Sequence, residues 1–179
     1  MTPEQRLDII LYRLDSARNL LLEIESHIER GFYNTAMNRM YYACFYAASA
    51  LLLYAEIDGV KTHEGVRQMF GKHFILTGKV PKEWGRFYTV IYNNRSEADY
   101  EDFKNFDLAT VEEFYPLVCE FINLIRERII SNNLLNKNLI KRDLGDVLGP
   151  LFLLIIISGL WEDENTRGMV CSDEVSGVL

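Results

Sequence analysis

The stretch "NTAMNRMYYACFYAASALLL", residues 34–53, decides the fold. Its alanines, methionines, tyrosines and leucines recur at three- and four-residue spacing over most of the circumference of a helix, whereas a surface helix carries a single apolar stripe. A helix that is apolar on most sides has to be surrounded by other elements. We therefore expect a helix from about residue 33 to 57 at the centre of the fold or at a subunit contact.

Helix signals flank this stretch on both sides. Thr2 and Gln5 form a capping-box pattern at the start of a long amphipathic segment, and Thr62 is a cap for a short helix. Pro81 opens a third long helix, and Asp107 is a suitable cap for a fourth. No alternating pattern typical of strands appears before residue 133. The sequence predicts an all-α domain over residues 1–132, an antiparallel, up-and-down bundle of four to five helices.

Beyond residue 132 the composition changes. Residues 133–179 contain an uncharged segment, residues 147–161, followed by a polar tail. The uncharged segment is shorter than the roughly 20 residues that span a bilayer. It is interpreted as a buried element that docks on the bundle or on another subunit, and the less favoured alternatives are membrane contact and disorder in isolation. The role of this C-terminal extension is not defined by its sequence.

The overall charge limits the kind of ligand. The formal net charge is −7, which disfavours broad nucleic-acid binding but leaves room for one local anion site. The three cysteines and three histidines lack metal-ligand spacing, so neither a metal nor another cofactor is expected. Each histidine, His63 beside the Thr62 cap included, is interpreted as a surface or helix-end residue. A reducing, cytoplasmic location fits this cysteine pattern.

One arginine stands among acidic and aromatic residues in "YNNRSEADYEDF", residues 92–103. Arg95 and Asp99 are four residues apart, so an intrahelical ion pair is one interpretation and an anion-binding site is the other. Tyr100 lies five residues after Arg95, about 140° around a regular helix. The two side chains would converge only if the helix ended or bent between them, or across a dimer.

The central helix also carries a stripe of polar residues. Asn38, Arg39 and Tyr42 follow one another at helical spacing next to the apolar surface. Tyrosines in such places are often core residues with the hydroxyl at the edge. A buried arginine there would need a carboxylate or a phosphate as its partner.

These stretches, together with "GVKTHEGVRQMFGKHFILTGKV", resemble the HEPN family over roughly residues 4–131. The resemblance implies a homodimer of four- or five-helix bundles with a cleft where the third helices meet. Many such proteins are metal-independent endoribonucleases of toxin-antitoxin or defence pairs, encoded beside a nucleotidyltransferase, and others bind nucleotides. Their motif is an arginine, a polar residue and a histidine four to six residues further on.

The resemblance maps the motif onto Arg95 and Ser96, with Tyr100 in place of the histidine. Arg95 and Tyr100 are thus the expected catalytic residues, and the expected RNA or nucleotide contacts are Asn38, Arg39, Tyr42, Ser96 and Asp99. Cleavage by internal attack needs a base and an acid, and tyrosine, with an ordinary pKa of about 10, is a poor base. The sequence thus predicts RNA or nucleotide binding with weakened ribonuclease activity. The alternative is a non-catalytic interaction module that acts through dimerisation and its apolar C-terminal segment.

Overall fold

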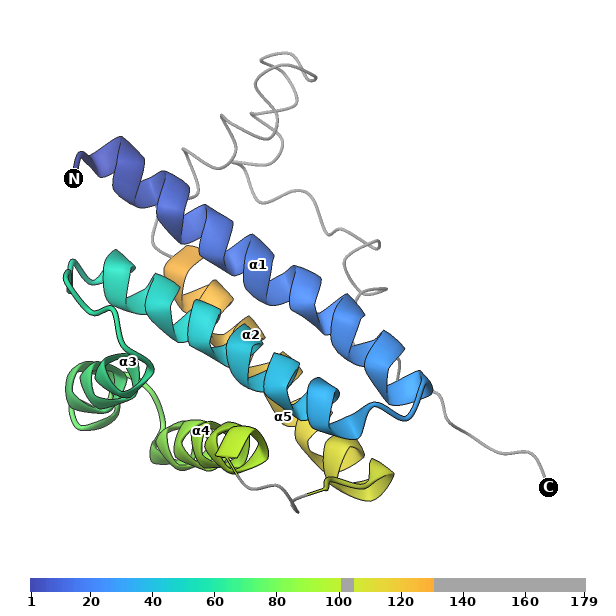
Figure 1. The fold of residues 1–179 in the computed structure, drawn as a ribbon. Coiled ribbons are helices and arrows are strands. Elements are labelled where there is room, and N and C mark those ends of the chain that lie inside the picture. Colours follow the sequence, from blue (N-terminus) through green and yellow to red (C-terminus); the bar gives the residue numbers. More distant parts are fainter. Residues whose placement is uncertain (101–104, 131–179) are drawn as a thin grey trace, which may run out of the picture. The chain divides into compact units, whose positions relative to one another are not determined.

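A computed structural model describes the backbone of residues 1–100 and 105–130 and the side chains of residues 1–95 and 105–130. Residues Met1–Ile129 form one compact unit. The described residues form five α-helices, a π-helical turn and no strand: α1 (Pro3–Glu29), α2 (Tyr33–Tyr54), α3 (His63–Phe70), η1 (Gly71–Ile75), α4 (Lys82–Tyr100) and α5 (Leu108–Ile130) (Figure 1). The predicted all-α helical bundle is confirmed. The expectations for residues 133–179 lie outside the described residues.

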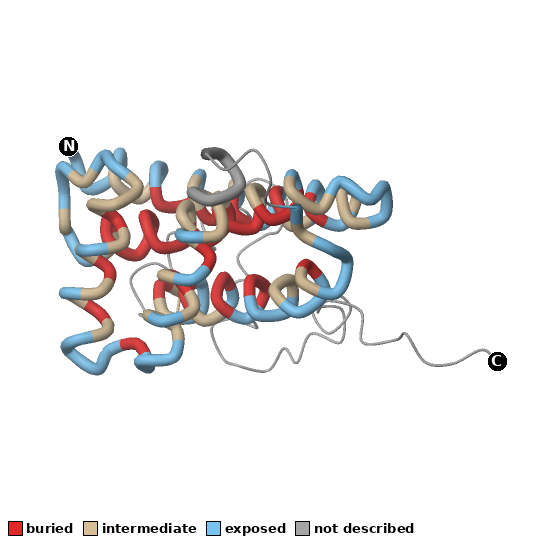
Figure 2. Tube along the Cα trace, turned by 60° about the horizontal axis from the view of Figure 1, so that its bottom comes forward, coloured by how far each residue is buried: buried red, intermediate tan, exposed pale blue. Residues whose placement is uncertain are grey.

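Helix α2 is the central element, as its sequence predicts. Thirteen of its 22 residues are buried, against six of 27 in α1. Several of the buried positions are alanines with no exposed surface, which allow neighbouring helices to approach closely. Helix α1 lies beside α2, and α3 and α4 lie on the side of α2 away from α1 (Figure 1). Figure 2 shows the buried residues along the sides of the helices that face one another.

Local interactions at the start of α1 and a glycine turn at its end position α1 against α2. The predicted capping box is present, because the Gln5 amide donates to Thr2 Oγ1 and the Thr2 amide donates to Gln5 Oε1. One turn later, the Arg6 guanidinium donates to both carboxylate oxygens of Asp58 at 2.7 and 2.8 Å and to the Leu53 carbonyl at 3.0 Å. At the other end, Gly31 adopts a φ of +74°, which a glycine accepts without strain. The chain thereby turns directly into α2.

Two close approaches place α3 and α4. The Thr62 hydroxyl caps α3 by accepting from the Gly65 amide, and a Cβ at Gly65 would lie only 2.8 Å from that hydroxyl oxygen. Helix α3 continues into η1, where the sequence predicts only a short helix and a turn. A Cβ at Gly85 of α4 would lie 2.9 Å from the Ile75 side chain, so this glycine lets α4 pack directly on η1. Gly65 therefore allows the cap of α3, and Gly85 allows α4 to pack on η1.

Helix α5 completes the described core. Its predicted cap is present, since Asp107 Oδ1 accepts from the Thr110 amide and hydroxyl. The Phe121 ring packs against Phe70 of α3 and Tyr88 of α4, with centroids 5.7 and 5.5 Å away. Helix α5 therefore contacts both α3 and α4 through this ring. Among the described helices, none combines the length and the apolar character needed to cross a bilayer.

Candidate functional site

A buried tyrosine lies where α2, α3 and α4 meet. Tyr41 has no exposed surface, and its neighbours are Tyr42 of α2, His63 of α3, and Tyr92 and Arg95 of α4. We call these five residues the Tyr41 cluster. All members except Tyr41 are partly exposed. The cluster therefore forms a partly exposed layer of aromatic and cationic groups over a buried ring.

Arg95 is held by the two tyrosines of α2. Its guanidinium carbon lies 5.7 Å from the centroid of the Tyr41 ring and 5.9 Å from that of Tyr42, both within cation–π range. Tyr88, Tyr92 and Arg95 follow at three- and four-residue spacing, which puts them on one face of α4. That face packs on α2, because Tyr88 stacks on Tyr41 with centroids 6.5 Å apart. The arginine is thus positioned before any ligand binds.

His63 is held by a hydrogen bond to Tyr41. The Tyr41 hydroxyl oxygen lies 2.8 Å from His63 Nδ1, and the His63 ring lies 4.5 Å from that of Phe45. Burial raises the pKa of the Tyr41 hydroxyl well above its usual value, although the nearby Arg95 lowers this pKa in part. The phenol therefore keeps its proton at neutral pH. It fixes the plane of the imidazole ring and hence the direction of Nε2.

A second cation lies at the rim of the cluster. The Arg67 guanidinium lies 5.3 Å from the Tyr92 ring centroid and binds both carboxylate oxygens of Glu64, at 2.6 and 3.0 Å. Hydrogen bonds from Arg67, and then from Gln68, lower the pKa of Glu64 to about 2. Glu64 is therefore ionised at neutral pH. The ion pair keeps Arg67 beside the tyrosines.

The predicted site residues separate into three groups. Tyr42 and Arg95 are brought together, and Asn38 lies one helical turn before Tyr42 on the same face of α2. Arg39 instead faces α1, where its Nε lies 3.6 Å from a Glu23 carboxylate oxygen. The third group is at the end of α4, where the side chains of Ser96, Asp99 and Tyr100 lie outside the described residues.

The course of α4 bears on the pairing of Arg95 with Tyr100. Helix α4 continues through Tyr100 without ending between the two positions. In a regular helix, positions five residues apart are rotated about 140° from each other around the axis, so positions 95 and 100 lie on different faces. The roles of Arg95 and Tyr100 stay predictions, and a shared role would have to be reached across two subunits.

A separate hollow of about 330 Å³ lies near the start of α2. It is lined by residues 31–35 together with Asn105 and Phe106, none of which carries a charge. Asn34 spans it, accepting from the Phe106 amide and donating to Asn105 Oδ1. The amide group of Asn34 thus joins α2 to the segment before α5. Within the described residues no group of histidines, cysteines and carboxylates could hold a metal ion.

Sequence reasoning did not find the part that α3 contributes. His63 does begin a helix, as expected, but its hydrogen bond to Tyr41 gives it a place in the cluster. Arg67, one turn later, was likewise not singled out. The available signal is the cap at Thr62, which fixes where α3 starts. The contact with α2 depends on the path of the loop between the helices, which no periodicity reports.

The described residues form an all-α bundle in which an arginine is held on tyrosines between neighbouring helices. A model of the HEPN domain matches residues 10–129. The chain belongs to the HEPN family. It is similar to a UPF0332 protein of Thermotoga maritima, with 35% identity over 121 residues, which are 68% of this chain and 91% of the relative.

Two archaeal relatives carry a functional name. A Methanocaldococcus jannaschii protein named "Putative toxin MJ0142" is 34% identical over 122 residues, covering 68% of this chain and 82% of the relative. A second protein of that organism, named "Putative toxin MJ0605", is 36% identical over 104 residues, which are 56% of this chain and 74% of the relative. The residues matched by the HEPN model, 10–129, include every member of the Tyr41 cluster.

Proposed function

We propose that this HEPN protein binds single-stranded RNA, or a nucleotide of the same chemistry, at the Tyr41 cluster. The observation that carries the proposal is Arg95 held over Tyr41 and Tyr42. A guanidinium matches the geometry of a phosphate and binds it through two parallel hydrogen bonds. Because the tyrosines already hold Arg95, little side-chain freedom is lost when the phosphate binds.

The partly exposed tyrosines supply the second half of the interaction. Bases stack on aromatic rings with little regard to sequence. Tyr42 lies against Arg95, and Tyr92 lies against Tyr41, one helical turn before Arg95 on α4. The net charge of −7 agrees with a small site and not with a long basic groove. Binding should therefore involve only a few nucleotides.

The biological setting of the proposal follows the relatives. The relatives named as toxins favour a role as the toxin-like member of a pair. The HEPN family adds two further expectations, which are that the protein is a homodimer and that its partner is a nucleotidyltransferase. Ribonuclease activity without a metal belongs to this proposal, at a reduced rate if Tyr100 is the group that stands in for the motif histidine. Tyr100 is also a candidate acceptor for modification by that partner.

The test compares two arginines of the same helix. Arg95 and Arg86 are nine residues apart, which puts them on opposite faces of α4, and Arg86 is exposed. We expect Arg95→Ala to weaken binding of a labelled single-stranded RNA by roughly tenfold or more, because a charged hydrogen bond to phosphate is lost. Arg86→Ala removes the same charge and should leave the affinity unchanged. Equal affinities of wild type and Arg95→Ala, for RNA and for ATP alike, would refute the proposal.

A further inference from the structure

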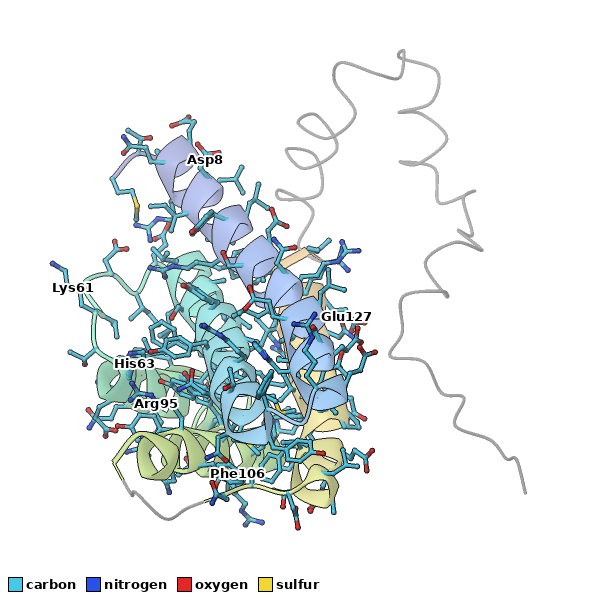
Figure 3. The ribbon with its side chains drawn as sticks, turned by 45° about the vertical axis from the view of Figure 1, so that its right-hand side comes forward. Asp8, Lys61, His63, Arg95, Phe106 and Glu127 are labelled. Carbon is cyan, nitrogen blue, oxygen red and sulfur yellow. The ribbon has the colours of Figure 1, made fainter. Side chains whose placement is uncertain are left out.

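The cluster places a histidine beside the arginine, although the motif in α4 has none. His63 and Arg95 contact the same pair of rings: the His63 ring lies 5.6 Å from the centroids of Tyr41 and Tyr42, and the Arg95 guanidinium lies 5.7 and 5.9 Å from them. Figure 3 shows the two side chains near one another, one from the start of α3 and one from α4. A phosphate bound by Arg95 would therefore lie close to an imidazole.

We propose that His63 is the catalytic proton-transfer residue of a metal-independent RNA cleavage at this cluster, in place of the histidine missing from α4. This inference rests on the proposed function, because it needs an RNA phosphate at Arg95. Imidazole suits the role, since it exchanges protons near neutral pH. Tyr41 acts as a positioning residue through its hydrogen bond to Nδ1.

The reaction is an internal transfer that needs no metal and no water. Nε2 of His63 takes the proton of the ribose 2′-hydroxyl while the 2′-oxygen forms a bond to phosphorus. The P–O5′ bond then breaks, and the imidazolium returns the same proton to the departing 5′-oxygen. Arg95 stabilises the negative charge that develops on the phosphoryl oxygens. The products are a 2′,3′-cyclic phosphate and a 5′-hydroxyl, and His63 ends in its starting state.

His63 lies on a different helix from the motif positions of α4. Position 100 lies five residues after Arg95, about 140° further around helix α4, which continues through it. His63 reaches the arginine from a different helix, and the Thr62 cap fixes the residue at which that helix begins. His63 and Arg95 therefore meet on the same two tyrosines within the described residues of one subunit.

The experiment uses the full chain, labelled single-stranded RNA and EDTA, and measures binding and cleavage separately. His63→Ala should reduce cleavage about 100-fold or more, as loss of a positioned acid-base group does, with binding nearly unchanged. His63→Asn keeps an amide able to bond to the Tyr41 hydroxyl, so it should fold normally and yet fail to cleave. Added imidazole should partly restore cleavage by His63→Ala, which a merely structural histidine would not permit. His73→Ala, in η1 outside the cluster, is the control and should cleave like wild type.

The outcomes separate this inference from the binding proposal. A wild type that binds RNA through Arg95 but does not cleave, or a His63→Asn variant that cleaves at the wild-type rate, overturns the role of His63 and leaves the binding proposal intact. Binding that is indifferent to Arg95→Ala overturns both. Cleavage that leaves a 3′-hydroxyl in place of the cyclic phosphate also overturns the inference, because internal attack cannot produce it.

Discussion

The hydroxyl oxygen of Tyr41 lies 2.8 Å from Nδ1 of His63 and thereby joins the middle of α2 to the first residue of α3. The two residues are 22 positions apart, so this bond fixes the loop between the two helices as well as the imidazole. Its strength can be measured because the same core contains a second buried tyrosine. The hydroxyl of Tyr88 has no hydrogen-bond partner in the described part of the chain.

Removal of the Tyr41 hydroxyl and removal of the Tyr88 hydroxyl should change the stability differently. We expect Tyr41→Phe to lower the free energy of unfolding by about 1 kcal/mol, because it deletes one side of a hydrogen bond and leaves His63 Nδ1 without it. Tyr88→Phe deletes a buried hydroxyl that the described residues do not pair, so stability should be unchanged or slightly higher. Urea denaturation of both variants gives the comparison. Equal losses would show that the Tyr41–His63 bond contributes nothing specific.

Glu64 should make stability depend on acid pH. Hydrogen bonds from Arg67 and Gln68 hold the folded pKa of Glu64 at about 2, below the ordinary value of 4.5. The folded state thus binds fewer protons than the unfolded state between these values, so the contribution of Glu64 is complete above about pH 4.5 and is lost as the pH falls towards 2. We expect wild type to exceed Glu64→Gln in urea midpoint at pH 6, with the difference vanishing near pH 2. Glu120→Gln, exposed on α5, is the control, and a pH-independent Glu64 difference would contradict the expectation.

The fold was predictable because its determinants are local. The caps at Thr2 and Asp107 and the periodicity of α2 each involve residues within a few turns of one another, and the structure confirms them. The π-helical turn at Gly71–Ile75 was not predictable in this way. The turn ends at Ile75, on which Gly85 of α4 packs, and this contact joins two elements across a turn, which spacing within one helix does not report.

The sequence indicates site residues one helix at a time. The resemblance to the HEPN motif singles out Arg95 on α4, the polar stripe on α2 includes Tyr42, and the structure places these two side chains together. Periodicity could not show that α3 adds His63, because spacing within a helix does not reveal which helix faces it. Arg39 illustrates the same limit. The sequence indicates that a buried arginine there would need a carboxylate or a phosphate as its partner, and the structure identifies the carboxylate as that of Glu23.

Two glycines of α3 and η1 should respond differently to alanine. A Cβ at Gly65 would lie 2.8 Å from the capping hydroxyl of Thr62, whereas one at Gly71 would meet nothing within 4 Å. Both substitutions gain about 1 kcal/mol of helix propensity. Only Gly65→Ala also displaces the cap, at a cost of about 1 kcal/mol or more. Gly71→Ala should therefore be the more stable variant by about 1–2 kcal/mol in urea denaturation, and equal stabilities would mean that the Thr62 cap adjusts freely.

The contact between α4 and η1 should be visible as a coupling between two residues. A Cβ at Gly85 would lie 2.9 to 3.2 Å from three atoms of the Ile75 side chain. Gly85→Ala should therefore cost about 1–3 kcal/mol through overpacking, partly offset by about 1 kcal/mol of helix propensity.

Ile75→Ala removes those three atoms, so Gly85→Ala made in that background should no longer overpack and should stabilise the protein. A double-mutant cycle in urea is expected to give a favourable coupling of about 0.5–3 kcal/mol between the two substitutions. Because η1 continues α3 and α4 carries Arg95, Gly85→Ala alone should also shift His63 relative to Arg95 and slow RNA cleavage, with the double variant recovering part of the rate. Additive stabilities would show that α4 moves away from η1 without resistance, and the close approach at Gly85 would then have no part in placing the two groups.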